Sequence, residues 1–393
     1  MLFRSYTDPK QVEWMYAQEL TKKPVQFVDD GVASDDCIQG NLGDCWLISA
    51  MSVLATRDEL LVGGRRGMEY DNNMIVDKDI ASLLSKGVYP PIFHKFRKIG
   101  LYVIRIFKNF TWIYVIVDER IPIDLKPVDT KGNVLPPRPV FGRCRSKHEL
   151  WVPLIEKAYA KMHGCYENLI SGYVDEGIQE LTGMQPEKIL IRNEHTGVFP
   201  HKMIEQHYGG SDGFWNFLLA RDQDGCLLGC SIKGNGKEGQ LILDGVPSGL
   251  ILNHAYGLND IMELDDGEGG TLRLLRLRNP WGKSEWLGAW SDNSPEIAKY
   301  KPVIEKYIQT LPPDEQFTLG ADDGTFLMHY DDWKDNFSTL FLNVDFPEDW
   351  TGVRFRSKWT KSNAGGLPTK YEKEHLERFA KNPQFLMKPA EDT

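Results

Sequence analysis

The segment Gln39-Gly40-Asn41-Leu42-Gly43-Asp44-Cys45-Trp46 decides how this chain is interpreted. The residues that follow, up to Leu54, are apolar or small, which predicts a buried helix over 45–54. Asp44 stands at the position of a helix N-cap, after a turn that contains Gly40 and Gly43. The pattern therefore places the thiol of Cys45 at the N-terminus of a helix.

A thiol in this position can act as a nucleophile, because the helix N-terminus stabilises the thiolate through its unpaired N–H groups and its dipole. Gln39 precedes Cys45 by six residues, and its side-chain amide can join the Cys45 backbone N–H in an oxyanion hole. A cysteine that opens an apolar helix is more often structural. The glutamine and the two glycines favour the catalytic interpretation.

A nucleophilic cysteine needs a base, and His254 is the candidate among nine histidines. It lies in the apolar run Leu250-Ile251-Leu252-Asn253-His254-Ala255-Tyr256-Gly257-Leu258, at the entry to a predicted strand. The other eight stand in polar or basic contexts and are predicted to be solvated. The alternative for His254 is a core histidine with satisfied hydrogen bonds.

A third candidate is Asn279, in Arg278-Asn279-Pro280-Trp281-Gly282. An asparagine side chain can accept a hydrogen bond from a histidine N–H and so fix the tautomer of the base, and Trp281 can shield that bond from water. The alternative is a turn that ends a strand. Cys45, His254 and Asn279 together have the composition of a nucleophile–base–orienter triad.

Composition narrows the function further. The chain has 393 residues and a formal net charge of −10, which argues against a nucleic-acid partner. No segment has the apolar length of a signal peptide or a membrane span, and six cysteines are too few for a disulfide scaffold. These features predict a cytoplasmic protein with reduced thiols.

The fold class is predicted as α+β. The first half contains a predicted hairpin (101–107 and 112–118), an exposed proline-rich loop (124–143) and a helix (149–162). From residue 185 onward, short apolar runs broken by Gly and Asp predict an antiparallel β-rich part. The expected organisation is an N-terminal arm (1–24), a first lobe with the nucleophile (25–184), a β-rich second lobe (185–346) and a C-terminal segment (347–393).

Several of these runs resemble the protease core of the calpain family, in the family's order. They are Gln39–Trp46, Leu154–Lys161, Glu176–Gly183, His254–Tyr256 and Leu275–Ser294. The resemblance implies a two-lobed, papain-like cysteine endopeptidase that cuts protein substrates through an acyl-thioester. It implies the triad Cys45, His254 and Asn279, with Gln39 in the oxyanion hole and Trp281, Trp46 and Asn253 at the substrate cleft.

The resemblance also implies regulation by calcium, with one site in each lobe. Gly31 (carbonyl), Asp36 and Glu156 match the first site. Glu285, Asp292, Asp323 and the carbonyl of Ala321 match the second. Oxygen ligands of this kind suit Ca²⁺. Without the resemblance, each acid would be interpreted as a solvated surface group.

Three positions depart from the family pattern. Thr325 replaces a carboxylate ligand, Ser34 replaces an arginine that bridges the lobes to that carboxylate, and Asn253 replaces the glycine before the histidine. Calcium activation is therefore expected to run mainly through Asp36 and Glu156. It is expected either to need high calcium or to be partly replaced by lobe closure without calcium, since no arginine–carboxylate bridge links the lobes. The separation from Cys45 to His254 is longer than is usual in the family. Most of the extra residues are assigned to loops around 72–89 and 124–143.

The stretch 350–393 resembles the opening strands of the C2-like domain that follows calpain cores. It is too short for a β-sandwich, so it is expected to be a partial C2-like segment, and any membrane contact is expected only through it. No EF-hand loop is found. Two rival functions remain: a catalytically silent calpain homologue acting as a scaffold, and acyl transfer of the transglutaminase type, which usually orients its histidine with Asp.

Overall fold

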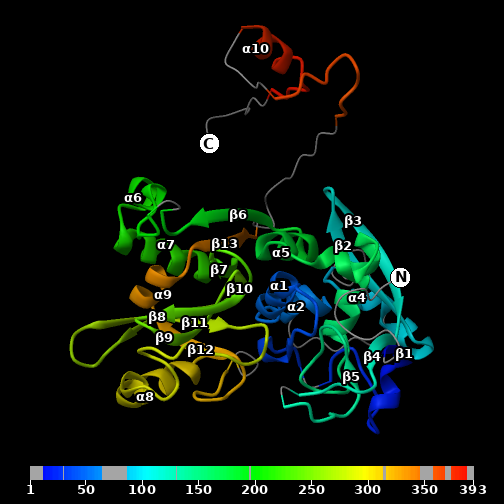
Figure 1. Cartoon of the computed structure of the whole chain (residues 1–393), viewed down its shortest axis with the longest axis horizontal. Coiled ribbons are helices and arrows are strands. Elements are labelled where there is room, and N and C mark those ends of the chain that lie inside the picture. Colours follow the sequence, from blue (N-terminus) through cyan, green and yellow to red (C-terminus); the bar gives the residue numbers. More distant parts are fainter. Residues whose placement is uncertain are drawn as a thin grey trace, which may run out of the picture. The chain divides into compact units, whose positions relative to one another are not determined.

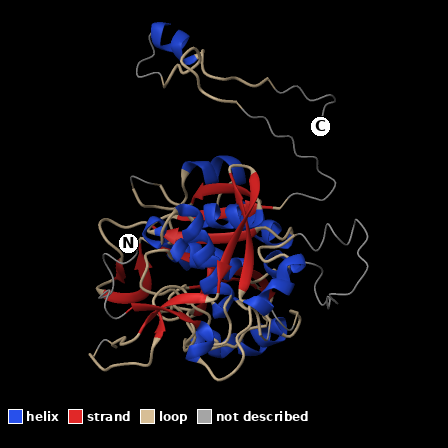
Figure 2. Ribbon diagram, turned by 90° about the vertical axis from the view of Figure 1, so that its right-hand side faces the viewer, coloured by secondary structure: helices blue, strands red, loops and turns tan. Residues whose placement is uncertain are grey.

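A computed structural model describes residues 12–29, 31–63, 86–129, 131–193, 196–312, 316–345, 357–367 and 373–386. The chain divides into two compact units, Met1–Phe346 and Pro347–Thr393, which are described separately. Helices and strands are interspersed throughout the larger unit, as expected for an α+β fold (Figure 2). Residues 72–85, part of the predicted extra loop, lie outside the described residues.

The first half of the larger unit is built around the helix that begins at Cys45. Its helices are α1 (Cys45–Leu54), α2 (Asp58–Val62), α4 (Trp151–His163) and α5 (Val174–Thr182), with short 3-10 turns η2 (Ala17–Leu20), η3 (Ser34–Asp36), η4 (Pro91–Ile99) and η5 (Tyr166–Leu169). Its strands are β1 (Val12–Tyr16), β2 (Leu101–Lys108), β3 (Thr111–Asp118), β4 (Arg120–Asp124) and β5 (Arg138–Pro139). Strands β2 and β3 form an antiparallel hairpin, and β1, β4 and β5 form a small sheet.

The second half contains a six-stranded antiparallel sheet in the order β12-β11-β10-β7-β13-β6. These strands are β6 (Gln185–Leu190), β7 (Leu227–Ile232), β10 (His254–Asp265), β11 (Thr271–Arg278), β12 (Thr325–His329) and β13 (Thr339–Val344). A separate hairpin pairs β8 (Gly239–Leu243) with β9 (Val246–Leu252). The helices of this half are α6 (Lys202–Tyr208), α7 (Ser211–Gln223), α8 (Pro295–Ile308) and α9 (Tyr330–Asn336).

Helix α1 connects the two halves. It lies between the α4 and β2–β3 region and the six-stranded sheet (Figure 1), and it packs on α5 and on strand β10. Every residue from Trp46 to Leu54 is buried, so its flanks are apolar all round. The Ser49 hydroxyl donates a hydrogen bond of 3.2 Å to the carbonyl of Ala255, the residue after His254. This contact fixes helix α1 against the strand that carries His254.

Local sequence signals predicted several of these elements. The helix over 45–54 and the hairpin over 101–118 are confirmed, as is the β-rich character from residue 185. The predicted helix over 149–162 is observed two residues later at its start, as α4. In the described residues of the predicted loop over 124–143, the strands are the last residue of β4 and the two-residue β5.

The C-terminal unit differs from its prediction. Its described residues, 357–367 and 373–386, contain one helix, α10 (Lys373–Phe379), and no strand. Asn382 ties the segment to itself, because its side chain accepts from Gly365 N at 2.8 Å and donates to Gly366 O at 3.0 Å. The C2-like β-structure is therefore not seen in these residues.

Within the described part of the chain, no helix combines the length and the apolar character that crossing a membrane requires.

Candidate active site

The nucleophile candidate stands where the sequence predicted it. Cys45 is the first residue of α1 and is partly exposed, whereas the rest of the helix is buried. Asp44 occupies the N-cap position, but its side chain makes no capping hydrogen bond. It is instead fully buried beside Glu156, and burial raises the pKa of Asp44 to about 6. The helix N-terminus is thus left without a side-chain cap.

The base candidate is held by a buried asparagine. His254 opens β10 and is 1% exposed, and its Nε2 lies 2.9 Å from Oδ1 of the fully buried Asn279. The same Oδ1 accepts from Trp281 N at 3.0 Å, and the Asn279 amide nitrogen donates to Ser284 O at 2.8 Å. These partners fix the orientation of the amide, so Oδ1 is an acceptor and Nε2 of His254 carries a hydrogen. Nδ1 is the ring nitrogen that Asn279 leaves to other partners.

The structure brings a third group to this pair that sequence reasoning missed. Sγ of Cys45, a ring nitrogen of His254 and a carboxylate oxygen of Glu238 all lie within 4.8 Å of one another. Oε1 of Glu238 is 2.6 Å from Nδ1 of His254. Burial by itself lowers the pKa of His254, but hydrogen bonds and charge interactions with Cys45 and Glu238 outweigh it and raise the pKa to about 9.

Glu238 reaches the site because Asn253 holds the β7–β8 loop. Oδ1 of Asn253 accepts from Gly234 N at 3.0 Å, and its amide nitrogen donates to Gly236 O at 3.2 Å and to Lys237 O at 3.3 Å. Asn253 has φ +55°, a left-handed conformation that asparagine tolerates better than most residues. The side chain that replaces the family's glycine therefore organises the loop that delivers Glu238.

Gln39 is held through both its side chain and its backbone. Its side-chain nitrogen donates to Leu42 O at 2.6 Å, and its backbone N–H donates to Pro280 O at 2.8 Å. Only one amide hydrogen is used on Leu42, so the second is available to a ligand. The backbone bond also ties the segment before Cys45 to the turn that carries Asn279.

The two tryptophans have different surroundings. The Trp281 ring is centred 4.7 Å from the His254 ring at an angle of 52°, and it is partly exposed, so it covers one face of the base. Trp46 is only 6% exposed, and its indole N–H donates to Leu169 O at 2.8 Å. Gly172 and Gly177 contact its ring closely. Trp46 is therefore a core residue and not part of a cleft, because its ring is buried against Gly172 and Gly177.

The second predicted calcium set is assembled in the structure. Glu285 Oε1 accepts from the backbone of Asp323 at 3.1 Å and of Gly324 at 2.7 Å, and Asp323 N donates to the Ala321 carbonyl at 2.9 Å. Burial and the neighbouring Asp292 raise the pKa of Glu285 to about 7. Burial is the first cause that raises the pKa of both Glu285 and Asp292, and carboxylate and carbonyl oxygens are the donors that Ca²⁺ takes.

The first predicted set is only partly assembled. Asp36 Oδ2 accepts from Ala33 N at 3.0 Å, in the loop that follows Gly31. Glu156 is not there: its two carboxylate oxygens lie 3.1 and 2.9 Å from Gly142 N, and burial and the charge of Asp44 raise its pKa. Glu149 lies near this loop instead, since its Oε1 accepts from Asp29 N at 2.8 Å. The assignment of Glu156 to this set is thus corrected, because α4 turns Glu156 into the core.

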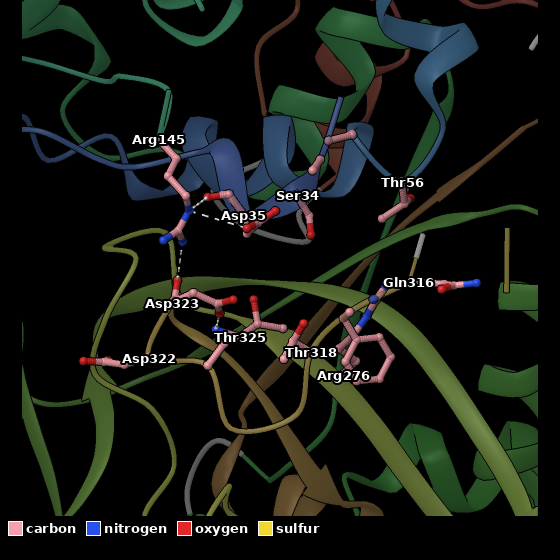
Figure 3. A pocket seen from close by; sticks show the side chains of 14 residues that line it. Ser34, Asp35, Thr56, Arg145, Arg276, Gln316, Thr318, Asp322, Asp323 and Thr325 are labelled. Carbon is pink, nitrogen blue, oxygen red and sulfur yellow. Dashed lines mark hydrogen bonds and ion pairs between the residues drawn. The ribbon is translucent and has the colours of Figure 1, made fainter. Parts of the chain in front are cut away.

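Ser34 and Thr325, two of the departures from the family pattern, line one cavity of about 370 Å³ (Figure 3). Arg145 crosses beside it: its Nε donates to Asp35 O at 3.3 Å and its Nη2 to Asp323 O at 3.4 Å. Arg278 also binds both segments, through the carbonyls of Ser34, Asp35, Cys37 and Asp323. The loop 34–37 is therefore joined to the sheet by arginine–carbonyl bonds in place of the missing arginine–carboxylate bridge.

Comparison with known proteins agrees with this geometry. Residues 1–343 match the family described as calpain family cysteine protease. The chain is 29% identical to calpain clp-1 of Caenorhabditis elegans, over 98% of this chain and 43% of that protein. It is 30% identical to the calpain-2 catalytic subunit of Bos taurus over 97% of this chain and 46% of that protein. It is 28% identical to the calpain-type cysteine protease DEK1 of Zea mays over 96% of this chain and 14% of that protein.

The chain thus spans less than half the length of these relatives. The matched residues include the helix that begins at Cys45, the strand that begins at His254 and the turn that holds Asn279. With this match over most of its length, the chain belongs to the calpain family of cysteine proteases.

Proposed function

We propose that this chain is a cysteine endopeptidase that cuts peptide bonds in protein substrates, with Cys45 as nucleophile. The observation that carries the proposal is the pair of contacts on His254. Asn279 Oδ1 lies 2.9 Å from Nε2, and a ring nitrogen lies within 4.8 Å of the Cys45 sulfur. This is the arrangement that a thiol–imidazole pair needs for proton transfer.

The reaction follows from these positions. Nδ1 of His254 takes the thiol proton, and the Cys45 sulfur attacks the peptide carbonyl carbon. The oxyanion accepts hydrogen bonds from the Cys45 backbone N–H and the second amide hydrogen of Gln39. The imidazolium returns its proton to the leaving amine as the C–N bond breaks, which gives an acyl-thioester. Water, deprotonated by His254, then hydrolyses the thioester and restores the thiol.

Regulation by calcium is the second part of the proposal. Glu285, Asp292, Asp323 and the Ala321 carbonyl would supply the oxygen ligands of one Ca²⁺, and Asp36 and Glu149 with the Gly31 carbonyl those of another. A bound cation would add positive charge beside these carboxylates. Each set of carboxylates adjoins a segment, residues 34–37 or Asp323, whose carbonyls bind Arg145 or Arg278. Neutralising the carboxylates with Ca²⁺ would therefore bias how the two halves of the larger unit pack.

A cytoplasmic location is proposed on the thiols. All six cysteines are free, and four of them are buried. Free thiols in this number suit a reducing compartment.

The rival function is a catalytically silent homologue that only binds other proteins. The contact of Glu238 with Nδ1 of His254 favours it, because that nitrogen must be free to serve Cys45. The rate of substrate cleavage distinguishes an active protease from a silent homologue.

Hydrolysis of casein and of fluorogenic peptides by the purified chain, with and without Ca²⁺, tests the proposal. The matched controls are Cys45→Ala and Cys165→Ala, since Cys165 is another partly exposed thiol. The expected result is cleavage by the parent and by Cys165→Ala, and none by Cys45→Ala. Cleavage that survives in Cys45→Ala would assign the activity to another group or a contaminant. No cleavage by the parent in any condition would favour the silent homologue.

A further inference from the structure

We propose that Cys45, His254 and Glu238 form a binding site for a thiophilic divalent cation such as Zn²⁺, and that the bound ion silences the proposed protease. The three side chains come from α1, β10 and the β7–β8 loop, and one donor atom of each lies within 4.8 Å of the other two. The inhibitory consequence rests on the proposed function. The binding site itself rests only on geometry and ligand chemistry.

The donor set is the one that Zn²⁺ takes in proteins. Thiolate, imidazole and carboxylate bind it at about 2.3, 2.0 and 2.1 Å, and three protein ligands leave a fourth tetrahedral position for water. Donor atoms around such an ion lie about 3.5 Å apart. The Nδ1–Oε1 distance of 2.6 Å is shorter than that, and Glu238 is the one exposed member of the three. A small rotation of this exposed side chain therefore opens the space for the ion.

The histidine is already prepared as a ligand. Metal-binding histidines usually donate their other ring N–H to a fixed acceptor, which sets the tautomer. Nε2–H of His254 is donated to Asn279 Oδ1, so it is Nδ1, on the side of Glu238, that gives up its proton to a metal and supplies the lone pair. The buried Asn279 is itself held by Trp281 N and Ser284 O. Ligand and supporting contacts are thus both present.

The third ligand, Glu238, is held in place by Asn253, which is not itself a ligand. Asn253 fixes the loop backbone at Gly234, Gly236 and Lys237, directly before Glu238. Asn253 can therefore be changed to loosen Glu238 while all three donors remain. This gives a variant that separates a built site from three donors that are close by chance.

The site selects a different ion from the acidic clusters. Glu285, Asp292 and Asp323 offer only oxygen, which suits Ca²⁺, whereas the sulfur of Cys45 favours Zn²⁺ and related soft ions. An ion bound here occupies both the Cys45 sulfur and the His254 Nδ1. Neither group is then free for attack or proton transfer, so binding and proteolysis exclude each other.

Metal binding is measured on the metal-free full chain by calorimetry with Zn²⁺, and by absorption spectroscopy with Co²⁺ as a probe of thiolate ligation. The variants are Glu238→Gln, which keeps the size of the side chain, Asn253→Gly and Cys45→Ser. Asp244→Asn is the control, because Asp244 is an exposed acid in the neighbouring β8–β9 turn.

The expected result is one Zn²⁺ per chain and a thiolate–Co²⁺ band in the parent and in Asp244→Asn. Glu238→Gln is expected to weaken Zn²⁺ binding at least tenfold, and Asn253→Gly to weaken it by a smaller factor. Cys45→Ser is expected to lose the Co²⁺ band. Excess Ca²⁺ is expected not to displace Zn²⁺.

Zn²⁺ affinity unchanged in Glu238→Gln would overturn the three-ligand site. A thiolate band that persists in Cys45→Ser would place the metal elsewhere. These readouts need no substrate, so they stand apart from the proposed function. If the metal-free chain binds Zn²⁺ but cleaves no substrate, the proposed protease function is wrong and the metal site stands. If the chain cleaves substrate but does not bind Zn²⁺, the metal site is wrong and the protease function stands.

Discussion

The carboxylate of Glu238 lies 2.6 Å from Nδ1 of His254, while Asn279 holds the other ring nitrogen at 2.9 Å. Both partners accept hydrogen bonds, so the contact with Glu238 favours the doubly protonated ring. The nitrogen that Glu238 occupies is the one that must return a proton to the leaving amine. A substrate therefore has to displace Glu238, which makes this contact a brake on the proposed reaction.

Glu238→Gln is expected to lower the pKa of His254 from about 9 toward its usual value of 6.5, because it removes a negative charge from Nδ1. NMR titration of the His254 ring measures this shift, with Asp244→Asn as the control. A pKa that stays near 9 in Glu238→Gln would show that Glu238 does not set it.

The same group predicts how stability depends on pH. The folded-state pKa of His254 is raised, so the stabilisation is fully present below 6.5 and is lost as pH rises through about 9. The free energy of unfolding of the parent is therefore expected to fall between these values more steeply than that of Glu238→Gln. Urea unfolding at several pH values measures it. Parallel curves for the two proteins would contradict the expectation.

Asn279→Ala is expected to reduce kcat by about 10²-fold or more with a smaller change in KM, because the base loses its fixed tautomer. The variant also leaves the Nε2–H of His254 buried without an acceptor, which costs about 1–3 kcal/mol of stability. Peptide kinetics and urea unfolding measure the two effects. Unchanged kcat would remove Asn279 from the triad.

Glu149, just before α4, and Glu156, within α4, allow calcium binding to be tested apart from core packing. Glu149→Gln is expected to weaken Ca²⁺ binding, since Glu149 adjoins the Asp29–Asp36 loop. Glu156→Gln is expected to leave Ca²⁺ affinity unchanged, because Glu156 is buried against Gly142 and Asp44. Calorimetry with Ca²⁺ measures both. The reverse ranking would restore Glu156 as the ligand.

Thr325→Glu is expected to tighten Ca²⁺ binding at the Glu285–Asp323 set, because it adds a carboxylate beside Asp323. Ser34→Arg together with Thr325→Glu is expected to fill the cavity that both residues line. A double-mutant cycle in urea is expected to give a favourable coupling of about 0.5–3 kcal/mol. Zero coupling would show that the two side chains do not meet.

Much of this arrangement could be predicted because its signals are local. The apolar run after Asp44 fixed the bounds of α1, and the motifs around His254 and Asn279 named two groups that the structure joins directly. The contact of Glu238 with His254 could not be predicted, since it depends on how Asn253 folds a loop between two strands. The exchange of Glu156 for Glu149 has a similar cause. The two glutamates lie seven residues apart, and only tertiary packing decides which one faces the loop that follows Asp29.

The central claim is that Cys45, activated by His254, is the nucleophile. Labelling the purified chain with a peptide epoxide and locating the adduct by mass spectrometry tests it most directly, because all six thiols compete in one sample. The predicted result is one rapid adduct on Cys45 in the parent that is formed far more slowly in His254→Ala. An adduct on Cys165 or Cys37, or equal labelling of Cys45 in His254→Ala, would contradict the account.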